Sequence, residues 1–316
     1  MKQFVPNSDI YAVDALYNQP LLASIHLIKS NDRIAIVDTG TSHSVDEVNK
    51  ALQNLGLNFD NVEFIILTHI HLDHAGGAGQ LMQLCKNAHL IVHPKGARHM
   101  AEPQKLIDGT IAVYGEDKFK KIYGEILPID KHRIIEPKDG ETINFSGREL
   151  TFIDTPGHAN HHHCIIDKQT NSVFTGDTLG VGYRALRDDD NVFLLASSTP
   201  VQFNPVALHQ SINKVMSYKP EWLYLTHYSA VKPNEQMIAN LHEQIDDFVV
   251  LTEMCANQNE DEFTRDLEQK MLDYCLHKCQ NMLPNLSEDL IRKWTEFDAK
   301  LNVQGLVFWW NYRRAH

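Results

Sequence analysis

Short apolar runs separated by polar turns fill the first three quarters of the chain. Each run has four to six residues rich in Ile, Val, Leu or Phe, and such runs between Gly, Asn and Asp are typical of strands. They lie at residues 33–38, 63–68, 89–93, 149–154, 172–175 and 222–226. Residues 44–55 instead carry Val or Leu at intervals of three and four, which predicts a helix. The pattern therefore predicts a mixed α/β fold.

From about Asn234 onward the spacing of apolar residues becomes helical. A second helix is predicted to begin after Asn259, because Glu262 three residues later suits a helix start. Pro284 separates it from a third helix, predicted around residues 288–297. Residues 306–310 are strongly apolar, so we expect them to pack against the core or against a second copy in a homodimer.

Composition places the chain among globular proteins and narrows its partners. Apolar residues make up 43% and charged residues 22% of the 316 residues, and the net charge of −12 disfavours nucleic acid as a partner. No apolar run reaches the ~18 residues that span a membrane, and the first residues lack the apolar stretch of a secretion signal. The five cysteines are an odd number, typical of reduced thiols. We therefore expect a cytoplasmic protein that does not bind membranes.

Three histidines and an aspartate lie within six positions directly after the strand-like run at residues 63–68. His69 and His71 alternate, so both can face one ion, whereas Asp73 and His74 at the start of a helix can serve a second. Three imidazoles and a carboxylate at this density are not expected from packing alone. The segment therefore predicts metal binding.

Three later polar residues each follow a predicted strand. They are His158 after the turn at residues 155–157, Asp177 after residues 173–176, and His227 after residues 222–226. Each alone has an ordinary structural interpretation as a turn, cap or buried residue. Together with the histidine cluster, they complete the ligand inventory of a two-metal site.

The order of these motifs resembles that of the metallo-β-lactamase-fold hydrolases. An Asp at position 38 is followed by H-x-H-x-D-H at residues 69–74 and then by His158, Asp177 and His227. The resemblance covers residues 10–230 and implies an α/β fold, the four-layer αββα sandwich, with a C-terminal helical appendage. It implies a catalytic domain over residues 1–233 and a helical region over residues 234–316 that packs on the active-site side.

The resemblance also assigns roles to the motif residues. Asp38 would orient a ligand, and Asp177 would bridge two divalent ions; together with Asp73 these are the residues expected to act in catalysis. His69, His71 and His158 would hold the first ion. Asp73, His74 and His227 would hold the second. Zinc is the expected metal, although iron and manganese accept the same ligand types.

Within the family, the chain is similar to a branch that contains glyoxalase II, the alkylquinolone-pathway thioesterase and uncharacterised bacterial hydrolases. Residues 156–162 and the pair Gly305-Leu306 carry this similarity. Two differences separate the chain from glyoxalase II. The last motif reads Thr226-His227-Tyr228, where glyoxalase II has Gly-His-Glu. Gly180 stands where that enzyme has Phe. A glutathione thioester is therefore disfavoured as substrate.

The implied activity is hydrolysis of a small ester, thioester or lactone by a hydroxide that bridges the two ions, since metal binding lowers the pKa of water towards ~7. The expected partner is a small-molecule acyl substrate, with residues 308–310 as an apolar wall of its pocket. Tyr183 and Arg184, shortly after Asp177, are candidate substrate contacts that could stabilise a developing oxyanion.

Three alternatives remain open from the sequence. A phosphodiesterase could use the same metal site, although the net charge of −12 argues against a polyanionic substrate. An iron-dependent sulfur dioxygenase is also compatible, whereas a flavin-linked oxygen reductase would carry Glu in place of His71. A regulatory protein without activity is disfavoured, because a pure binding module has no need for all seven ligands.

Overall fold

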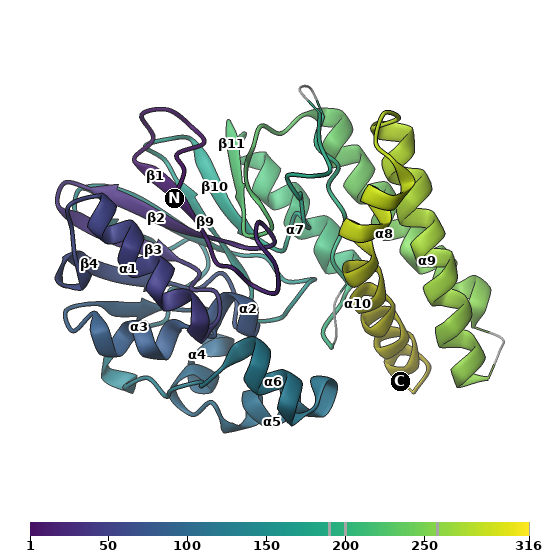
Figure 1. The fold of residues 1–316 in the computed structure, drawn as a ribbon, viewed down its shortest axis with the longest axis horizontal. Coiled ribbons are helices and arrows are strands. Elements are labelled where there is room, and N and C mark those ends of the chain that lie inside the picture. The colour runs from purple at the N-terminus through teal and green to yellow at the C-terminus, as the bar shows by residue number, and fades with distance from the viewer. Residues whose placement is uncertain (189–190, 199–200, 257–258, 316) are drawn as a thin grey trace. The chain divides into compact units, whose positions relative to one another are not determined.

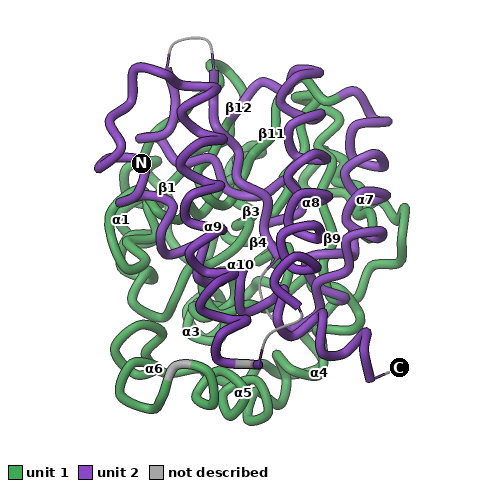
Figure 2. Tube along the Cα trace, turned by 90° about the vertical axis from the view of Figure 1, so that its right-hand side faces the viewer, with its two compact units in different colours: residues 1–154, 161–176, 220–230 green, residues 155–160, 177–219, 231–316 purple. Residues whose placement is uncertain are grey.

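The structure is a computed structural model that describes residues 1–188, 191–198, 201–256 and 259–315 (Figure 1). The chain forms two compact units, coloured separately in Figure 2. Unit 1 comprises residues 1–154, 161–176 and 220–230, and unit 2 comprises residues 155–160, 177–219 and 231–316. Unit 2 thus begins before residue 234, and the predicted boundary at residue 233 stays a prediction.

Two mixed sheets form the framework of unit 1. The first has the strand order β1-β2-β3-β4-β5-β6, in which β1 to β3 pair antiparallel and β3 to β6 pair parallel. Its strands are β1 (Ile10–Asp14), β2 (Ser24–Ser30), β3 (Arg33–Val37), β4 (Val62–Ile66), β5 (His89–Ile91) and β6 (Ile134–Ile135). Parallel pairing requires crossover connections, and helices supply them.

The second sheet has the order β12-β11-β10-β9-β8-β7. Neighbours from β7 to β10 pair antiparallel, and β10 pairs parallel with β11. Its strands are β7 (Thr142–Phe145), β8 (Arg148–Asp154), β9 (His163–Asp167), β10 (Ser172–Gly176), β11 (Trp222–Leu225) and β12 (Ser229–Val231).

Side chains from both sheets form one hydrophobic core. Val37 and Ile66 of the first sheet belong to the same buried cluster as Phe152 and Phe174 of the second. Burying apolar area in this way stabilises the fold by about 25 cal/mol per Å². The predicted fold class is therefore confirmed: two mixed sheets are flanked by helices, and further helices follow at the C-terminus.

The helices of unit 1 follow the first sheet's strands in the chain (Figure 1). They are α1 (Val45–Asn54), α2 (Leu72–Ala75), α3 (Ala78–Leu84), α4 (Pro94–Ala101), α5 (Gln104–Tyr114) and α6 (Glu116–Tyr123). Short 3-10 turns lie at Ser42–Ser44, Phe59–Asn61 and Lys131–Arg133. The helix predicted over residues 44–55 is confirmed as α1.

Unit 2 contains the long helices α7 (Pro205–Ser217), α8 (Glu235–Cys255), α9 (Glu260–Met282) and α10 (Glu288–Ala315). Asn259 caps α9 by accepting the Glu262 backbone N–H at 3.1 Å, which confirms the predicted helix start. The third predicted helix continues well beyond residue 297 and includes the apolar residues 306–310.

The described helices include none that is long and apolar enough to cross a membrane. The five cysteines, all among the described residues, are buried and form no disulfide.

Candidate metal centre

The predicted ligands of unit 1 follow the ends of its strands. Asp38 directly follows β3, and β4 leads through residues 67–71 into the four-residue helix α2, which carries Asp73 and His74. His227 lies two residues after β11 in the second sheet. Loops at strand ends are where α/β folds gather functional side chains. Both sheets of unit 1 therefore supply ligands.

Asp73, His74 and His227 form a compact triangle of ligand atoms inside unit 1. The two histidine Nε2 atoms are 3.3 Å apart. Asp73 Oδ2 lies 3.7 Å from His74 Nε2 and 3.4 Å from His227 Nε2. A tetrahedral cation with ligands at about 2.0–2.2 Å keeps them about 3.3–3.5 Å apart. The triangle thus has the chemistry and the dimensions of three ligands of one divalent ion.

Hydrogen bonds at the other ring nitrogen fix which atom of each histidine faces the triangle. His74 Nδ1 donates to Asp38 Oδ2 at 2.8 Å, and His227 Nδ1 donates to the Leu22 carbonyl at 2.8 Å. A carboxylate and a carbonyl only accept, so the hydrogen in each neutral ring lies on Nδ1. Both Nε2 lone pairs then point into the triangle, as ligation of a cation requires.

Asp38 is the buried acceptor at the centre of this arrangement. Its side chain is 1% exposed, and it accepts from the Thr68 backbone N–H at 2.8 Å, the Thr226 hydroxyl at 2.7 Å and His74. The Thr68 hydroxyl adds a contact of 2.9 Å to Asp38 Oδ2. Asp38 has a positive φ of 55°, which is uncommon outside glycine and directs its side chain to these donors. Asp38 thus accepts a hydrogen bond from the predicted ligand His74, and an orienting role for Asp38 stays a prediction.

The other predicted ligands also lie close to polar side chains. In unit 1, His69 Nε2 lies 2.9 Å from His71 Nδ1. In unit 2, His158 Nδ1 lies 3.1 Å from the Ser197 hydroxyl, and His158 Nε2 lies 3.6 Å from Asp177 Oδ2. His158 directly follows the turn after β8, and Asp177 directly follows β10.

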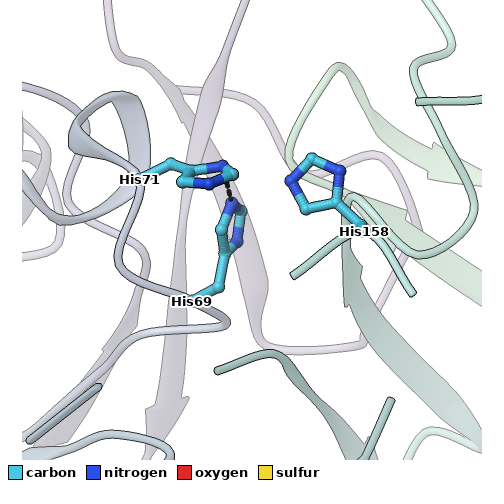
Figure 3. A group of neighbouring side chains, drawn as sticks. All are labelled: His69, His71 and His158. Carbon is cyan, nitrogen blue, oxygen red and sulfur yellow. Dashed lines mark hydrogen bonds between the residues drawn. The ribbon is translucent and has the colours of Figure 1, made fainter. Parts of the chain in front are cut away.

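Among the described residues, ligand atoms within 4.8 Å of one another form three groups. Figure 3 shows the imidazoles of the first group. The groups are His69, His71 and His158; His69, His74 and Asp177; and Asp73, His74 and His227. Every predicted ligand thus belongs to at least one group that could hold a metal.

Buried histidines surround the predicted ligands. His162 is fully buried, and its ring stacks 4.9 Å from that of His69. Burial, and then the neighbouring His71, lowers the pKa of His161 to about 3. Burial, and then His93, lowers the pKa of His163 to about 3, and its Nε2 donates to the Leu67 carbonyl. The rings of His161 and His163 are therefore neutral near pH 7.

Three hydroxyl residues that bond to Asp38 or to a predicted ligand were not predicted from the sequence. Thr68, Thr226 and Ser197 each bond to Asp38 or to a predicted ligand. The two threonines precede His69 and His227 directly, so a hydroxyl before each ligand histidine was the available signal. Ser197 carried no such signal, because it is far from His158 in the chain.

The two candidate substrate contacts lie in unit 2. Tyr183 is 2% exposed, its hydroxyl donates to Asp298 Oδ2 at 2.8 Å, and its ring lies 5.3 Å from that of Trp294. Burial, and then the neighbouring Arg184, lowers the pKa of Arg187 to about 10. Tyr183 therefore anchors its segment to α10, and a role of Tyr183 or Arg184 in substrate binding stays a prediction.

Unit 2 also contains an apolar cavity of about 1050 Å³. Its walls come from α7, α8, α10 and the segment before α7. Phe203, Phe308 and Trp309 contribute aromatic rings, and His209 and Arg313 contribute polar groups. Asn160, two residues after His158, also lines it.

Comparison with known proteins identifies the family. The sequence model described as the Metallo-beta-lactamase superfamily matches residues 18–227, more than half of the chain. The chain belongs to the metallo-beta-lactamase superfamily. The resemblance inferred from the motif order is thereby confirmed, and the fold of this superfamily accounts for the two sheets and their helices.

Relatives of this superfamily protein include a metallo-beta-lactamase fold-containing protein and an acyl-coenzyme A thioesterase. The metallo-beta-lactamase fold-containing protein ST1585 from Sulfurisphaera tokodaii is 24% identical over 218 residues, 68% of this chain and 76% of that protein. The acyl-coenzyme A thioesterase MBLAC2 from Bos taurus is 24% identical over 185 residues, 52% of this chain and 61% of its own length. The crystal structure of the family protein TTHA1429 from Thermus thermophilus has a TM-score of 0.62 at 19% identity, covering 99% of this chain and 96% of that one.

Proposed function

We propose that the protein is a binuclear metal-dependent hydrolase that cleaves the ester, thioester or lactone bond of a small acyl substrate. The triangle of Asp73, His74 and His227 carries the proposal, because its three atoms are spaced as ligands of one divalent ion. The similarity to an acyl-coenzyme A thioesterase of the same superfamily supports an acyl substrate.

Two ions are proposed because two of the ligand groups share no residue. His69, His71 and His158 form one, and Asp73, His74 and His227 form the other. Asp177 groups with one histidine from each, namely His69 and His74, which suits a carboxylate shared by two ions. Zinc fits imidazole and carboxylate ligands and remains the metal we propose first.

The side chains of the protein have distinct tasks in this proposal. When bound, such ions lower the pKa of water towards ~7 and polarise the substrate carbonyl. Asp38 holds the Nδ1 proton of His74, so that Nε2 stays available as a ligand. The Leu22 carbonyl does the same for His227.

We further propose that the apolar cavity of unit 2 binds the hydrocarbon part of the substrate. Aromatic and aliphatic walls with a few polar groups are typical of small-molecule sites, and about 1050 Å³ is ample for an acyl group. Arg313 lies within cation–π distance of Trp309, 5.6 Å from its ring centroid. This places one positive charge beside the apolar wall.

Metal analysis combined with a parallel substrate screen tests the function. The purified protein is expected to hold about two zinc, manganese or iron ions per chain. It is expected to hydrolyse a thioester, a p-nitrophenyl ester or a lactone at least tenfold faster than bis-p-nitrophenyl phosphate. Greater activity on the phosphodiester would favour a phosphodiesterase. Oxygen consumption with glutathione persulfide would favour the dioxygenase.

Two histidine substitutions provide the matched comparison. His227→Ala removes one corner of the triangle. It is expected to lower the metal content from about two ions to about one per chain and to lower kcat by at least tenfold. His132→Ala removes an exposed imidazole outside the predicted ligand set and is expected to leave both unchanged. A folded His227→Ala variant with full activity would contradict the proposal.

A further inference from the structure

Thr226 lies between β11 and the predicted ligand His227 and is 2% exposed. Its hydroxyl donates to Asp38 Oδ2 at 2.7 Å. Its carbonyl accepts from the Ser24 backbone N–H at 2.8 Å and from the Ser24 hydroxyl at 3.0 Å. Two different segments of unit 1 therefore hold this residue, one through its side chain and one through its backbone.

The oxygen that accepts from Thr226 is the one that orients His74. Asp38 Oδ2 accepts from His74 Nδ1 at 2.8 Å, and the Thr68 hydroxyl lies 2.9 Å from it. Thr68 also contacts Asp38 Oδ1 through its backbone N–H, whereas the Thr226 hydroxyl contacts Oδ2. The Thr226 hydroxyl is thus the contact that links Asp38 to the segment carrying His227.

We propose that Thr226 is a positioning residue, which sets the separation of His74 Nε2 and His227 Nε2 through its hydrogen bond to Asp38. This inference rests on the proposed metal function and deepens it. It concerns the ion held by Asp73, His74 and His227. It predicts that one hydroxyl, which touches no ligand atom of the triangle, controls the affinity of that ion.

The physical basis is the rigidity of a charge-assisted network. A carboxylate fixed by several donors holds its partner ring in one orientation, and outer partners of ligand histidines typically change metal affinity by about 10- to 100-fold. Without the Thr226 hydroxyl, Asp38 Oδ2 still accepts from His74 Nδ1 and the Thr68 hydroxyl. It loses its hydrogen bond to the segment that follows β11 and carries His227. The Leu22 carbonyl still accepts from His227 Nδ1, but it does not link His227 to Asp38.

The test measures zinc binding directly and does not depend on turnover. The protein is stripped with a chelator and titrated with Zn²⁺ against a chromophoric competitor, which resolves the two dissociation constants. Thr226→Val keeps the shape of the side chain and removes the hydroxyl. We expect it to raise one dissociation constant about 10- to 100-fold and to leave the other within about threefold of the wild-type value. Thr226→Ser retains a hydroxyl and is expected to remain within about threefold for both ions.

Thr252→Val is the matched control, because it removes another buried threonine hydroxyl, which donates to the Phe248 carbonyl within α8. It is expected to lower the melting temperature without changing either dissociation constant. If Thr226→Val does not fold, Thr226→Ala and Thr226→Ser are compared instead, with the same expectation that only the hydroxyl-bearing variant retains wild-type affinity.

The outcomes separate this inference from the proposed function. A wild-type chain that binds neither zinc, manganese nor iron would overturn both. Two tight zinc ions in wild type and also in Thr226→Val would overturn the positioning role alone. Equal weakening of both ions in Thr226→Val would do the same, because it would indicate general destabilisation.

Discussion

Buried charges in unit 1 are neutralised by close partners. Arg148 and Asp167 are both fully buried; Arg148 Nε donates to Asp167 Oδ1 at 3.0 Å, and its Nη2 contacts Oδ2. Arg148 also donates to the Ser8 carbonyl at 3.2 Å, while Thr170 contacts Asp167. Such a pair adds little net stability when intact, but loss of one partner leaves an uncompensated charge in the core.

Replacement of Arg148 by Met should therefore lower the free energy of unfolding by about 3–5 kcal/mol, because Asp167 would remain buried without its guanidinium. Urea denaturation at pH 7 measures this change. Lys168→Met is the control, since its ion pair with Glu149 is exposed and is expected to contribute less than about 1 kcal/mol. Similar losses in the two variants would contradict this interpretation of the buried pair.

His26 makes the stability of unit 1 depend on pH. Burial lowers the pKa of His26 to about 4 despite the opposing charge of Asp38, and its ring packs edge-on against Phe174 and Tyr224. In the unfolded chain a histidine titrates near its ordinary value of about 6.5. Between pH 6.5 and 4 the unfolded chain therefore binds more protons, so acidification destabilises the fold.

We expect His26→Gln to remove a share of this pH dependence, up to about 3 kcal/mol between pH 6.5 and 4. Urea denaturation across that range measures it as a shallower fall in the free energy of unfolding. His132→Gln, at an exposed position, should retain the wild-type slope. Parallel curves for wild type and His26→Gln would show that His26 is not the titrating group.

At the level of elements, six strands were predicted from short apolar runs, whereas β1, with an apolar run at residues 10–13, was not among them. All six predicted strands occur, as β3, β4, β5, β8, β10 and β11. β2 and β9 were missed because polar residues interrupt or open them: His26 lies within β2, and His163 begins β9. His26 contacts the Ser229 hydroxyl and His163 the Leu67 carbonyl, and no local pattern reveals these distant partners.

The candidate site was predictable to a similar extent. The predicted ligand residues stand in recognisable motifs, and each belongs to a group of side chains that could hold a metal; their role as ligands stays a prediction. The Leu22 carbonyl and the Ser197 hydroxyl could not be predicted, because their contacts join segments far apart in the chain. The extent of α10 was also underestimated, because residues 306–310 were interpreted only as an apolar terminus.

Two helical glycines of unit 1 should respond in opposite ways to substitution by alanine. A Cβ at Gly79 in α3 would overlap the Leu127 carbonyl oxygen, so Gly79→Ala would push α3 away from the backbone at Leu127. This substitution should destabilise the protein by more than about 1 kcal/mol. Gly109 in α5 has no atom within 4 Å of its added Cβ, so Gly109→Ala should stabilise by about 0.5–1 kcal/mol through helix propensity. Thermal denaturation compares them, and a change of the same sign in both would contradict the steric argument.

For the whole molecule, metal removal is expected to lower stability. A ligand that binds only the folded chain stabilises it by about 4 kcal/mol at a thousandfold excess over its dissociation constant. Treatment with a chelator should therefore lower the melting temperature, and added Zn²⁺ should restore it. His227→Ala should show a smaller shift than wild type, whereas an equal shift in both would place the stabilising ion elsewhere.

The apolar cavity of unit 2, proposed to bind the acyl group, gives a second prediction at this scale. Phe308 lines it and Phe297 does not, although both lie on α10 with exposed fractions of 44% and 36%. Phe308→Ala should raise KM for a medium-chain acyl thioester at least fivefold, because apolar contact with the acyl chain is lost, and kcat and metal content should persist. Phe297→Ala should leave KM unchanged. Equal effects of the two substitutions would remove the cavity from substrate binding.

The sequence distance between His74 and His227 has a mechanical consequence. The two residues are 153 positions apart, and they follow strands of different sheets in unit 1. A cation clasped by both would act as a cross-link, comparable to a disulfide that closes a loop of that length and restricts the unfolded chain by about 5 kcal/mol. The two sheets could then separate only after a bond between the ion and one of the two histidines broke. The ion would therefore slow unfolding as well as take part in hydrolysis.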